Sequence, residues 1–193
     1  MNSKHDKRSL QQTKTKNTTS SLVSIALTTA IIAILTQLSL PSPTGVPVTL
    51  QTFAVALVGY ILLPKHSLYS ILLYILIGAI GLPVFTNFRG GLSHLAGLTG
   101  GFLWGYLIYA PLCGLGMKMS GLFPAIACGS TGLLLCHALG TLQYAFLTSN
   151  SVTTAFLMVS LPYLLKDVLC LVIAYLMAKA VRGRLIKSGL KLS

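Results

Sequence analysis

The sequence predicts an all-α polytopic membrane protein with six transmembrane helices. Three observations support this fold class. Hydrophobic residues make up 54% of the 193 residues, charged residues make up only 8%, and the mean hydropathy is +0.81. Such values are typical of integral membrane proteins, because a globular domain carries far more charge. The composition leaves no segment that would form a separate soluble domain.

The charge distribution indicates a lipid bilayer rather than a nucleic acid as the surroundings of the chain. The net charge of +12 comes from 14 basic and two acidic residues. The basic residues gather at the two ends and in short connectors, as the positive-inside rule expects, instead of lining a groove. We therefore expect a membrane protein that does not bind nucleic acid.

The two ends of the chain are predicted to be basic cytoplasmic tails. Residues 1–21 combine five basic side chains with runs of Thr, Ser and Gln, which indicates a disordered tail. A transit or signal peptide is the alternative interpretation, although no small-residue cleavage site follows the first apolar run. Residues 182–193 form the second tail, and residues 22–181 form the predicted membrane domain.

The first predicted span, residues 22–40, has about the 20 residues that a bilayer core requires. Ala26, Ala30 and Ala33 recur along it at helical spacing and form a smooth stripe for close packing. The helix that packs there could belong to this chain or to another subunit. Residues 41–47 contain three prolines and therefore predict a stiff, non-helical outer loop, which is also a candidate lid.

Five further apolar segments complete the predicted bundle. They are residues 53–63, 68–82, 101–115, 122–147 and about 155–181. Gly97, Gly101 and Gly105 repeat at every fourth position, which favours close helix packing. If the amino terminus is cytoplasmic, six spans return the carboxyl terminus to the cytoplasm, and 12 of the 14 basic residues fall on the inner side.

The charges that this topology leaves unexplained are functional candidates. Arg89 and Lys166 fall towards the outer side, and Asp167 is the single carboxylate of the membrane domain. An ionisable side chain inside a membrane is costly unless it is paired or hydrated, so it indicates function by default. The alternative is a structural ion pair of Asp167 with one of the two basic residues. On a helix Tyr163, Asp167 and Cys170 share one face, which could contact a small molecule.

The segment between the third and fourth spans is predicted to line a cavity. It is rich in glycine, and irregular backbone at membrane depth survives only where protein buries it or where it lines a cavity. Glycine pairs let the backbone approach a ligand closely, and polar side chains between them provide donors. These residues are Asn87, Arg89, Gly90, Gly91, Gly100 and Gly101. The alternative is a plain turn with helix caps.

The sequence gives no sign of an enzyme or of a bound cofactor. One carboxylate in the membrane domain cannot provide a paired acid and base, and the Walker A, G-x-S-x-G and H-E-x-x-H motifs are missing. The four cysteines and four histidines are scattered without the spacing of metal ligands. We expect no catalytic residues, no metal and no cofactor.

Several motifs of the chain resemble those of the BioY family. They are GVPVTLQT at residues 45–52, GAIGLPVF at residues 78–85, TGGF at residues 99–102, and Pro162-Tyr163 leading to Asp167. BioY proteins are the biotin-specific substrate-binding components (S components) of bacterial energy-coupling factor (ECF) transporters. The resemblance extends over nearly all of residues 22–181 and implies the ECF S-component type of fold. It also implies an outward-facing biotin pocket in the bacterial cytoplasmic membrane.

The resemblance further implies partners and residue roles. The partners are a transmembrane coupling subunit, which would contact the stripe of Ala26, Ala30 and Ala33, and a pair of ATPases. The biotin ureido ring has two N–H donors and one carbonyl acceptor, so Asp167 would accept from the nitrogens while Asn87 donates to the oxygen. The carboxylate of biotin would take Arg89 or Lys166 as its cation. The apolar walls would be Phe85, Phe88 and Tyr163.

The chain departs from the family pattern at two positions. Cys170 stands where the family usually has a lysine, which leaves Lys166 as a substitute, and Leu98 stands where the family usually has a proline. The second function that the sequence allows is a stand-alone secondary transporter of biotin, proton-coupled or facilitative, with Asp167 as the proton carrier. A third is a membrane enzyme acting on a lipid or cofactor precursor.

Overall fold

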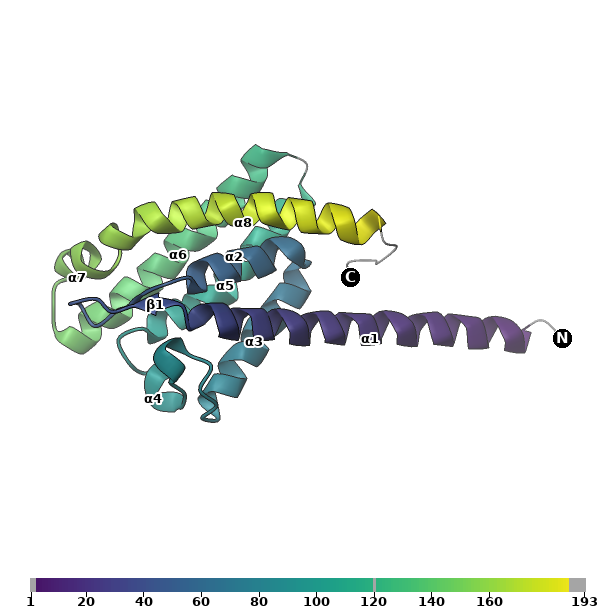
Figure 1. The fold of residues 1–193 in the computed structure, drawn as a ribbon, viewed down its shortest axis with the longest axis horizontal. Helices are drawn as coiled ribbons and strands as arrows, with labels where there is room; N and C mark the ends of the chain where they lie inside the picture. Colours follow the sequence, from purple (N-terminus) through teal and green to yellow (C-terminus); the bar gives the residue numbers. More distant parts are fainter. Residues whose placement is uncertain (1–2, 120, 188–193) are drawn as a thin grey trace.

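The structure, a computed structural model, describes residues 3–119 and 121–187. The described part of the chain contains eight α-helices, a short 3₁₀ turn and one two-stranded hairpin (Figure 1). The helices are α1 (Ser3–Thr36), α2 (Gln51–Ile61), α3 (Pro64–Ala79), α4 (Leu92–Leu95), α5 (Gly100–Lys118), α6 (Leu122–Thr148), α7 (Val152–Val159) and α8 (Leu161–Lys187). The hairpin strands are β1 (Ser39–Leu40) and β2 (Val48–Thr49), and the 3₁₀ turn is η1 (Thr86–Phe88).

The all-α fold class is confirmed, and each of the six predicted spans corresponds to a helix or a helix pair. In the part of the chain that the structure describes, three helices are long and apolar enough to cross a membrane. They are residues 18–36 of α1, α5 and α6, and the bent pair α7 and α8 makes a fourth. With 11 and 16 residues, α2 and α3 are shorter than the roughly 20 residues that a complete span requires.

Most helix ends lie a few residues from the predicted ends of the spans, and two differences are larger. Helix α1 begins at Ser3, so residues 3–21, which we expected to be disordered, are helical in the structure. The predicted sixth span is not continuous, because α7 and α8 meet at Ser160 with a bend of 50°. Pro162 explains this break, since proline lacks an N–H group and is tolerated only in the first turn of a helix. The division of the chain into two tails and a membrane domain stays a prediction.

The core of the bundle depends on close packing between α5 and α6. A Cβ atom on Gly105 would lie only 2.6 Å from the Cα atom of Cys136, and Gly101 and Gly140 are just as crowded. Small residues at such contacts let two helix backbones approach closely. The structure therefore confirms the packing role that the glycine spacing predicts for Gly101 and Gly105.

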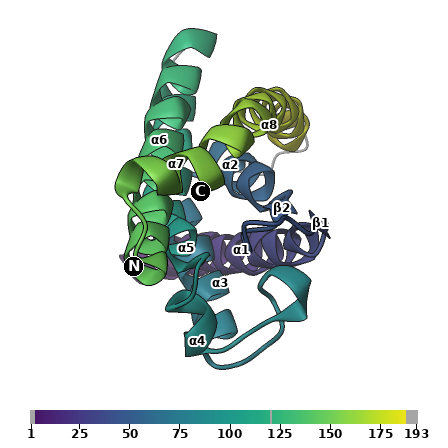
Figure 2. The same ribbon diagram turned by 90° about the vertical axis from the view of Figure 1, so that its left-hand side faces the viewer.

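The irregular segments gather at one end of the bundle. The hairpin, η1 and α4 lie there together with α7, whereas the start of α1 and the end of α8 point the opposite way (Figure 1). Seen towards this end, α7 bridges α6 and α8, and the hairpin lies beside α1 (Figure 2). Most of the irregular backbone is therefore concentrated at one end of the bundle.

Candidate functional site

The loop at residues 41–47 is confirmed as non-helical and connects the two hairpin strands. Two tyrosines attach it to the bundle. The Tyr163 hydroxyl of α8 donates to the carbonyl oxygen of Val46 at 2.6 Å and lies 2.9 Å from the Ser42 hydroxyl. The Tyr144 hydroxyl of α6 donates to the carbonyl oxygen of Thr44 at 3.2 Å. The loop is thus attached to α6 and α8 in this structure, and Tyr163 is one of its anchors.

The turn around η1 is held by the end of α1. Asn87 and Phe88 have φ angles of 60° and 55°, which are unusual for residues other than glycine. Gln37 supports this conformation, because its Oε1 accepts from the Phe88 N–H at 2.9 Å and its Nε2 donates to the carbonyl oxygens of Val84 and Phe85, each at 3.2 Å. A strained turn held by several hydrogen bonds is common at ligand sites.

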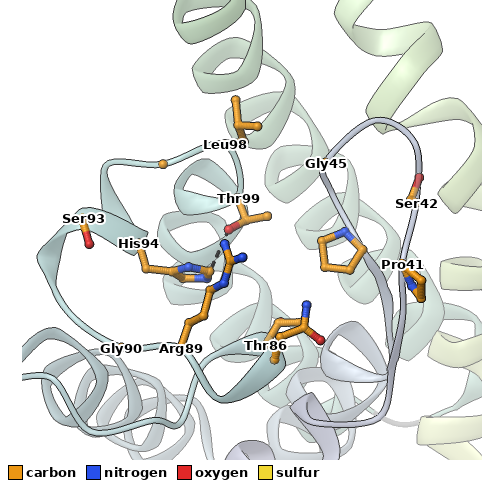
Figure 3. Close-up of a pocket in the computed structure, with 13 residues that line it drawn as sticks. Pro41, Ser42, Gly45, Thr86, Arg89, Gly90, Ser93, His94, Leu98 and Thr99 are labelled. Carbon is orange, nitrogen blue, oxygen red and sulfur yellow. Dashed lines mark hydrogen bonds between the residues drawn. The ribbon is translucent and has the colours of Figure 1, made fainter.

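A cavity of about 530 Å³ lies between the hairpin loop and the segment from η1 to α5, and we call it the outer cavity (Figure 3). Arg89 extends into it beside His94 and Thr99, and Ser42 and Gly45 lie across from them (Figure 3). Small-molecule pockets typically have volumes of about 300–1,000 Å³. The outer cavity is therefore large enough for a ligand.

His94 is the titratable neighbour of Arg89 in the outer cavity. Its ring stacks on Phe85 with a centroid distance of 5.0 Å, and its Nε2 lies 3.2 Å from the Thr99 hydroxyl. Burial, and secondly the charge of Arg89, lower the pKa of His94 from its ordinary value of 6.5. Among the described residues that line this cavity, Arg89 thus supplies the positive charge at neutral pH.

A second cavity, the inner cavity, adjoins the first. It has a volume of about 40 Å³, which has room for only a few water molecules. The two cavities share four lining residues, which are Pro47, Thr86, His94 and Thr99. The inner cavity is lined further by Gln51, Thr52, Tyr106, His137, Tyr163, Lys166 and Asp167. A ligand would have to widen this space to enter it.

Asp167 is the charged centre of the inner cavity. It is 3% exposed, and its Oδ1 forms an ion pair with the Lys166 ammonium. Lys166 Nζ also donates to the carbonyl oxygen of Thr49 in β2 at 2.9 Å. Lys166 therefore occupies one acceptor position of Oδ1, and a carboxylate oxygen has room to accept a further hydrogen bond. This remaining acceptor position belongs to a residue that lines the inner cavity.

The other carboxylate oxygen belongs to a polar network that crosses from α8 to α6. Asp167 Oδ2 and His137 Nε2 are 3.1 Å apart, and His137 Nδ1 lies 3.1 Å from the Ser160 hydroxyl. The Ser160 hydroxyl is in turn 2.7 Å from that of Thr141. The break between α7 and α8 places Ser160 in this network.

The structure divides the predicted site residues into two groups. Tyr163, Lys166 and Asp167 line the inner cavity, and Asn87, Arg89 and Gly90 line the outer cavity. The family resemblance implies that Asp167 and Asn87 both bind the ureido ring, whereas the two residues line adjacent cavities.

Five other predicted site residues line neither cavity, and they are Phe85, Phe88, Gly91, Gly100 and Gly101. Phe85 is fully buried beneath His94. The two glycines at the start of α5 are pressed against protein, since a Cβ on either would collide with a backbone carbonyl. Gly91 has a φ of 96° and allows the turn into α4. The place of these residues in binding stays a prediction.

Two residues of the site were missed in the sequence analysis. His137 is the one histidine within the span predicted at residues 122–147, and the cost of an ionisable group in a membrane would have indicated it. Gln37 gives no such signal, because its hydrogen-bond partners around η1 are far away in the sequence.

Comparison with known proteins gives consistent results. A model of the BioY family matches residues 6–187. The chain is 36% identical over 158 residues to the biotin transporter BioY of Thermotoga maritima, covering 81% of this chain and 92% of that protein. It is 34% identical over 160 residues to the probable biotin transporter BioY of Pyrococcus horikoshii, covering 82% and 94%.

The fold is also similar to a solved structure. A crystal structure of the S-component for biotin from an ECF-type ABC transporter superposes with a TM-score of 0.78 at 23% sequence identity. The match covers 87% of this chain and 93% of that chain. The bundle and its irregular end therefore have the architecture of that S-component.

Proposed function

The chain belongs to the BioY family, and we propose that it binds biotin at the outer face of a bacterial cytoplasmic membrane as the substrate-specific component of an ECF transporter. The observation that carries the proposal is the buried carboxylate of Asp167, which lines the inner cavity and lies next to a cavity of ligand size. Biotin is the transported ligand in this proposal, and the chain is neither an enzyme nor a holder of a cofactor.

The inner cavity suits the ureido ring of biotin. This ring carries two N–H donors and one carbonyl acceptor, so an N–H can donate to Asp167 Oδ1. Lys166 has three ammonium donors, of which one goes to Thr49 and one faces Asp167, and the third can reach the ureido oxygen. Entry of the ring requires the contact between Lys166 and Thr49 to shift, because the inner cavity is too small as it stands.

The outer cavity suits the carboxylate of biotin. A guanidinium group binds a carboxylate through two parallel hydrogen bonds, and Arg89 is available for this contact. Asn87 accepts from the Ser39 hydroxyl through Oδ1 at 2.8 Å, which leaves its amide N–H groups free among the described residues. The position of Asn87 beside Arg89 favours the carboxylate, rather than the ureido oxygen, as its partner.

The exposed alanines of α1 support a coupling subunit as partner. Ala26 and Ala30 are exposed, whereas Ala33 is half-buried and packs against the core. We expect Ala26→Trp and Ala30→Trp to retain biotin binding by the isolated chain and to lose ATP-driven uptake, because a large side chain prevents close helix contact. Uptake that persists in both variants would remove this face from the interface.

The topology of the proposal places both chain ends in the cytoplasm. The start of α1 and the end of α8 lie towards the same end of the bundle, away from the two cavities (Figure 1). The basic residues of these segments agree with a cytoplasmic location under the positive-inside rule. Accessibility of a tag placed at each end, in intact and in opened cells, tests this orientation.

A stand-alone secondary transporter, proton-coupled or facilitative, is the second candidate. It is favoured by the buried pair of Asp167 and His137, which could take up a proton during transport. Uptake of labelled biotin into vesicles distinguishes the two functions. ATP dependence with purified coupling subunit and ATPases supports the S component, whereas uptake by the chain alone that an uncoupler abolishes supports the secondary transporter. Recovery of chemically altered biotin would contradict both.

A further inference from the structure

The orientation of the Asp167 carboxylate depends on a histidine that the proposed biotin contacts do not include. His137 is 4% exposed, and its Nε2 lies 3.1 Å from Asp167 Oδ2. An ionised carboxylate only accepts hydrogen bonds, so Nε2 carries the hydrogen whether the imidazole ring is neutral or charged. His137 is therefore a fixed donor to one oxygen of Asp167.

The imidazole ring itself has little freedom to rotate. Its Nδ1 is hydrogen bonded to the Ser160 hydroxyl, which is in turn hydrogen bonded to the Thr141 hydroxyl. The edge of the ring meets Phe102 at a centroid distance of 5.6 Å and an interplanar angle of 88°. These contacts come from α5, α6 and the junction of α7 with α8, so three parts of the bundle determine where the Nε2 donor points.

The Lys166 contact does not provide the same precision. The Lys166 side chain is 28% exposed and also donates to the carbonyl oxygen of Thr49 in the hairpin. In the proposed binding mode this contact with Thr49 shifts when the ureido ring enters. A point charge on a flexible stem neutralises a carboxylate without fixing its rotation. Of the two partners of Asp167, His137 is thus the one that remains in place.

We propose that His137 is a positioning residue for biotin recognition: by donating to Oδ2, it orients Asp167 so that Oδ1 faces the inner cavity and accepts a ureido N–H. This inference rests on the proposed function of the chain. Ser160 and Thr141 support it by holding the imidazole ring. In this role His137 acts on biotin through Asp167, although its ring also lines the inner cavity.

The test is a double-mutant cycle on biotin affinity, measured with labelled biotin on the purified full chain. We expect His137→Leu to weaken binding by about tenfold or more, because a hydrogen bond to a charged group is lost. His137→Gln should retain most of the affinity, since its amide reaches Asp167 with a donor. In the Asp167→Asn background, His137→Leu should cause little further loss, because the two residues act through one contact.

Tyr60→Phe serves as the matched control. It removes a buried hydrogen bond to the carbonyl oxygen of Ala125 on α6, and Tyr60 lines neither cavity. We expect this variant to lower the unfolding temperature and to leave biotin affinity unchanged.

The outcomes separate the inference from the function on which it rests. An equal loss from His137→Leu in both backgrounds, or no loss at all, would overturn the positioning role while leaving a biotin receptor. If His137→Leu does not fold, His137→Asn replaces it, because its shorter amide reaches Ser160 but not Asp167. His137→Asn should then bind biotin as weakly as is expected for His137→Leu. Biotin binding by His137→Asn as tight as that by His137→Gln would also overturn the positioning role. A folded wild type that does not bind biotin refutes the proposed function instead.

Discussion

The inner and outer cavities are built in opposite ways. In the inner cavity, Asp167 is buried between helices and already has His137 and Lys166 as partners. In the outer cavity, Arg89 projects from a loop and has no ion pair or side-chain hydrogen bond to any described residue. In the proposed binding mode, biotin gains a new ionic contact at the outer end, but exchanges protein contacts for its own at the inner end. Under the proposed function, charge attracts the ligand at the outer end, and the geometry of the inner end selects it.

Removing the outer charge should have the largest effect. We expect Arg89→Ala to weaken biotin binding by about ten- to a hundredfold, because a charged hydrogen-bonded contact is lost. The affinity of Arg89→Ala for biotinamide, which has no carboxylate, should be close to that of the wild type. The biotin affinity of Arg89→Lys should lie between those of the wild type and Arg89→Ala. Competition binding with the two ligands measures this. Equal losses for both ligands would show that Arg89 supports the fold of the loop rather than the carboxylate.

Removing the charge of Lys166 in the inner cavity should mainly lower the stability of the protein. Lys166→Met leaves the Asp167 carboxylate with His137 as its remaining partner among the described side chains. Breaking a buried pair costs about 3–5 kcal/mol, and we expect about 1–2 kcal/mol here because Lys166 is partly exposed. Thermal unfolding in detergent measures it. Adding Asp167→Asn to Lys166→Met should restore stability, and a double variant that is less stable than Lys166→Met would contradict the pairing.

Loosening the turn at η1 should affect only the outer end. Gln37→Leu removes hydrogen bonds to the Phe88 N–H and to the carbonyl oxygens of Val84 and Phe85. We expect biotin affinity to fall by about fivefold, which corresponds to one net hydrogen bond. In the Arg89→Ala background the substitution should change biotin affinity little. An undiminished loss there would mean that Gln37 acts elsewhere.

In both regions the sequence predicted the elements and single residues better than the contacts between them. The six helical segments, the non-helical loop at residues 41–47, and Asp167 follow from composition, proline content and the cost of a buried charge. The contacts of Asp167 with His137 and of Gln37 with the η1 turn join residues distant in the sequence, so no local pattern shows them. The division into two cavities also depends on how the hairpin packs over the bundle, which periodicity does not specify.

The smallest expected effect concerns His94 and pH. Its pKa lies below 6.5 in the folded protein, so the folded state favours the neutral ring. As pH falls from 6.5 towards this lower pKa, the unfolded chain binds the proton first, and stability therefore decreases. We expect His94→Gln to flatten the pH dependence of the unfolding temperature in this range. A wild type that becomes more stable on acidification through this window would contradict the assignment.

Equilibrium binding of labelled biotin to the purified chain, without coupling subunit or ATPases, is the most direct test of a biotin site that contains Asp167. The proposed function predicts tight binding by the wild type and a loss of about tenfold or more in Asp167→Asn, equivalent to about 1.4 kcal/mol. It also predicts that the variant still unfolds cooperatively. A folded wild type that does not bind biotin, or an Asp167→Asn variant that binds as tightly as the wild type, would contradict it.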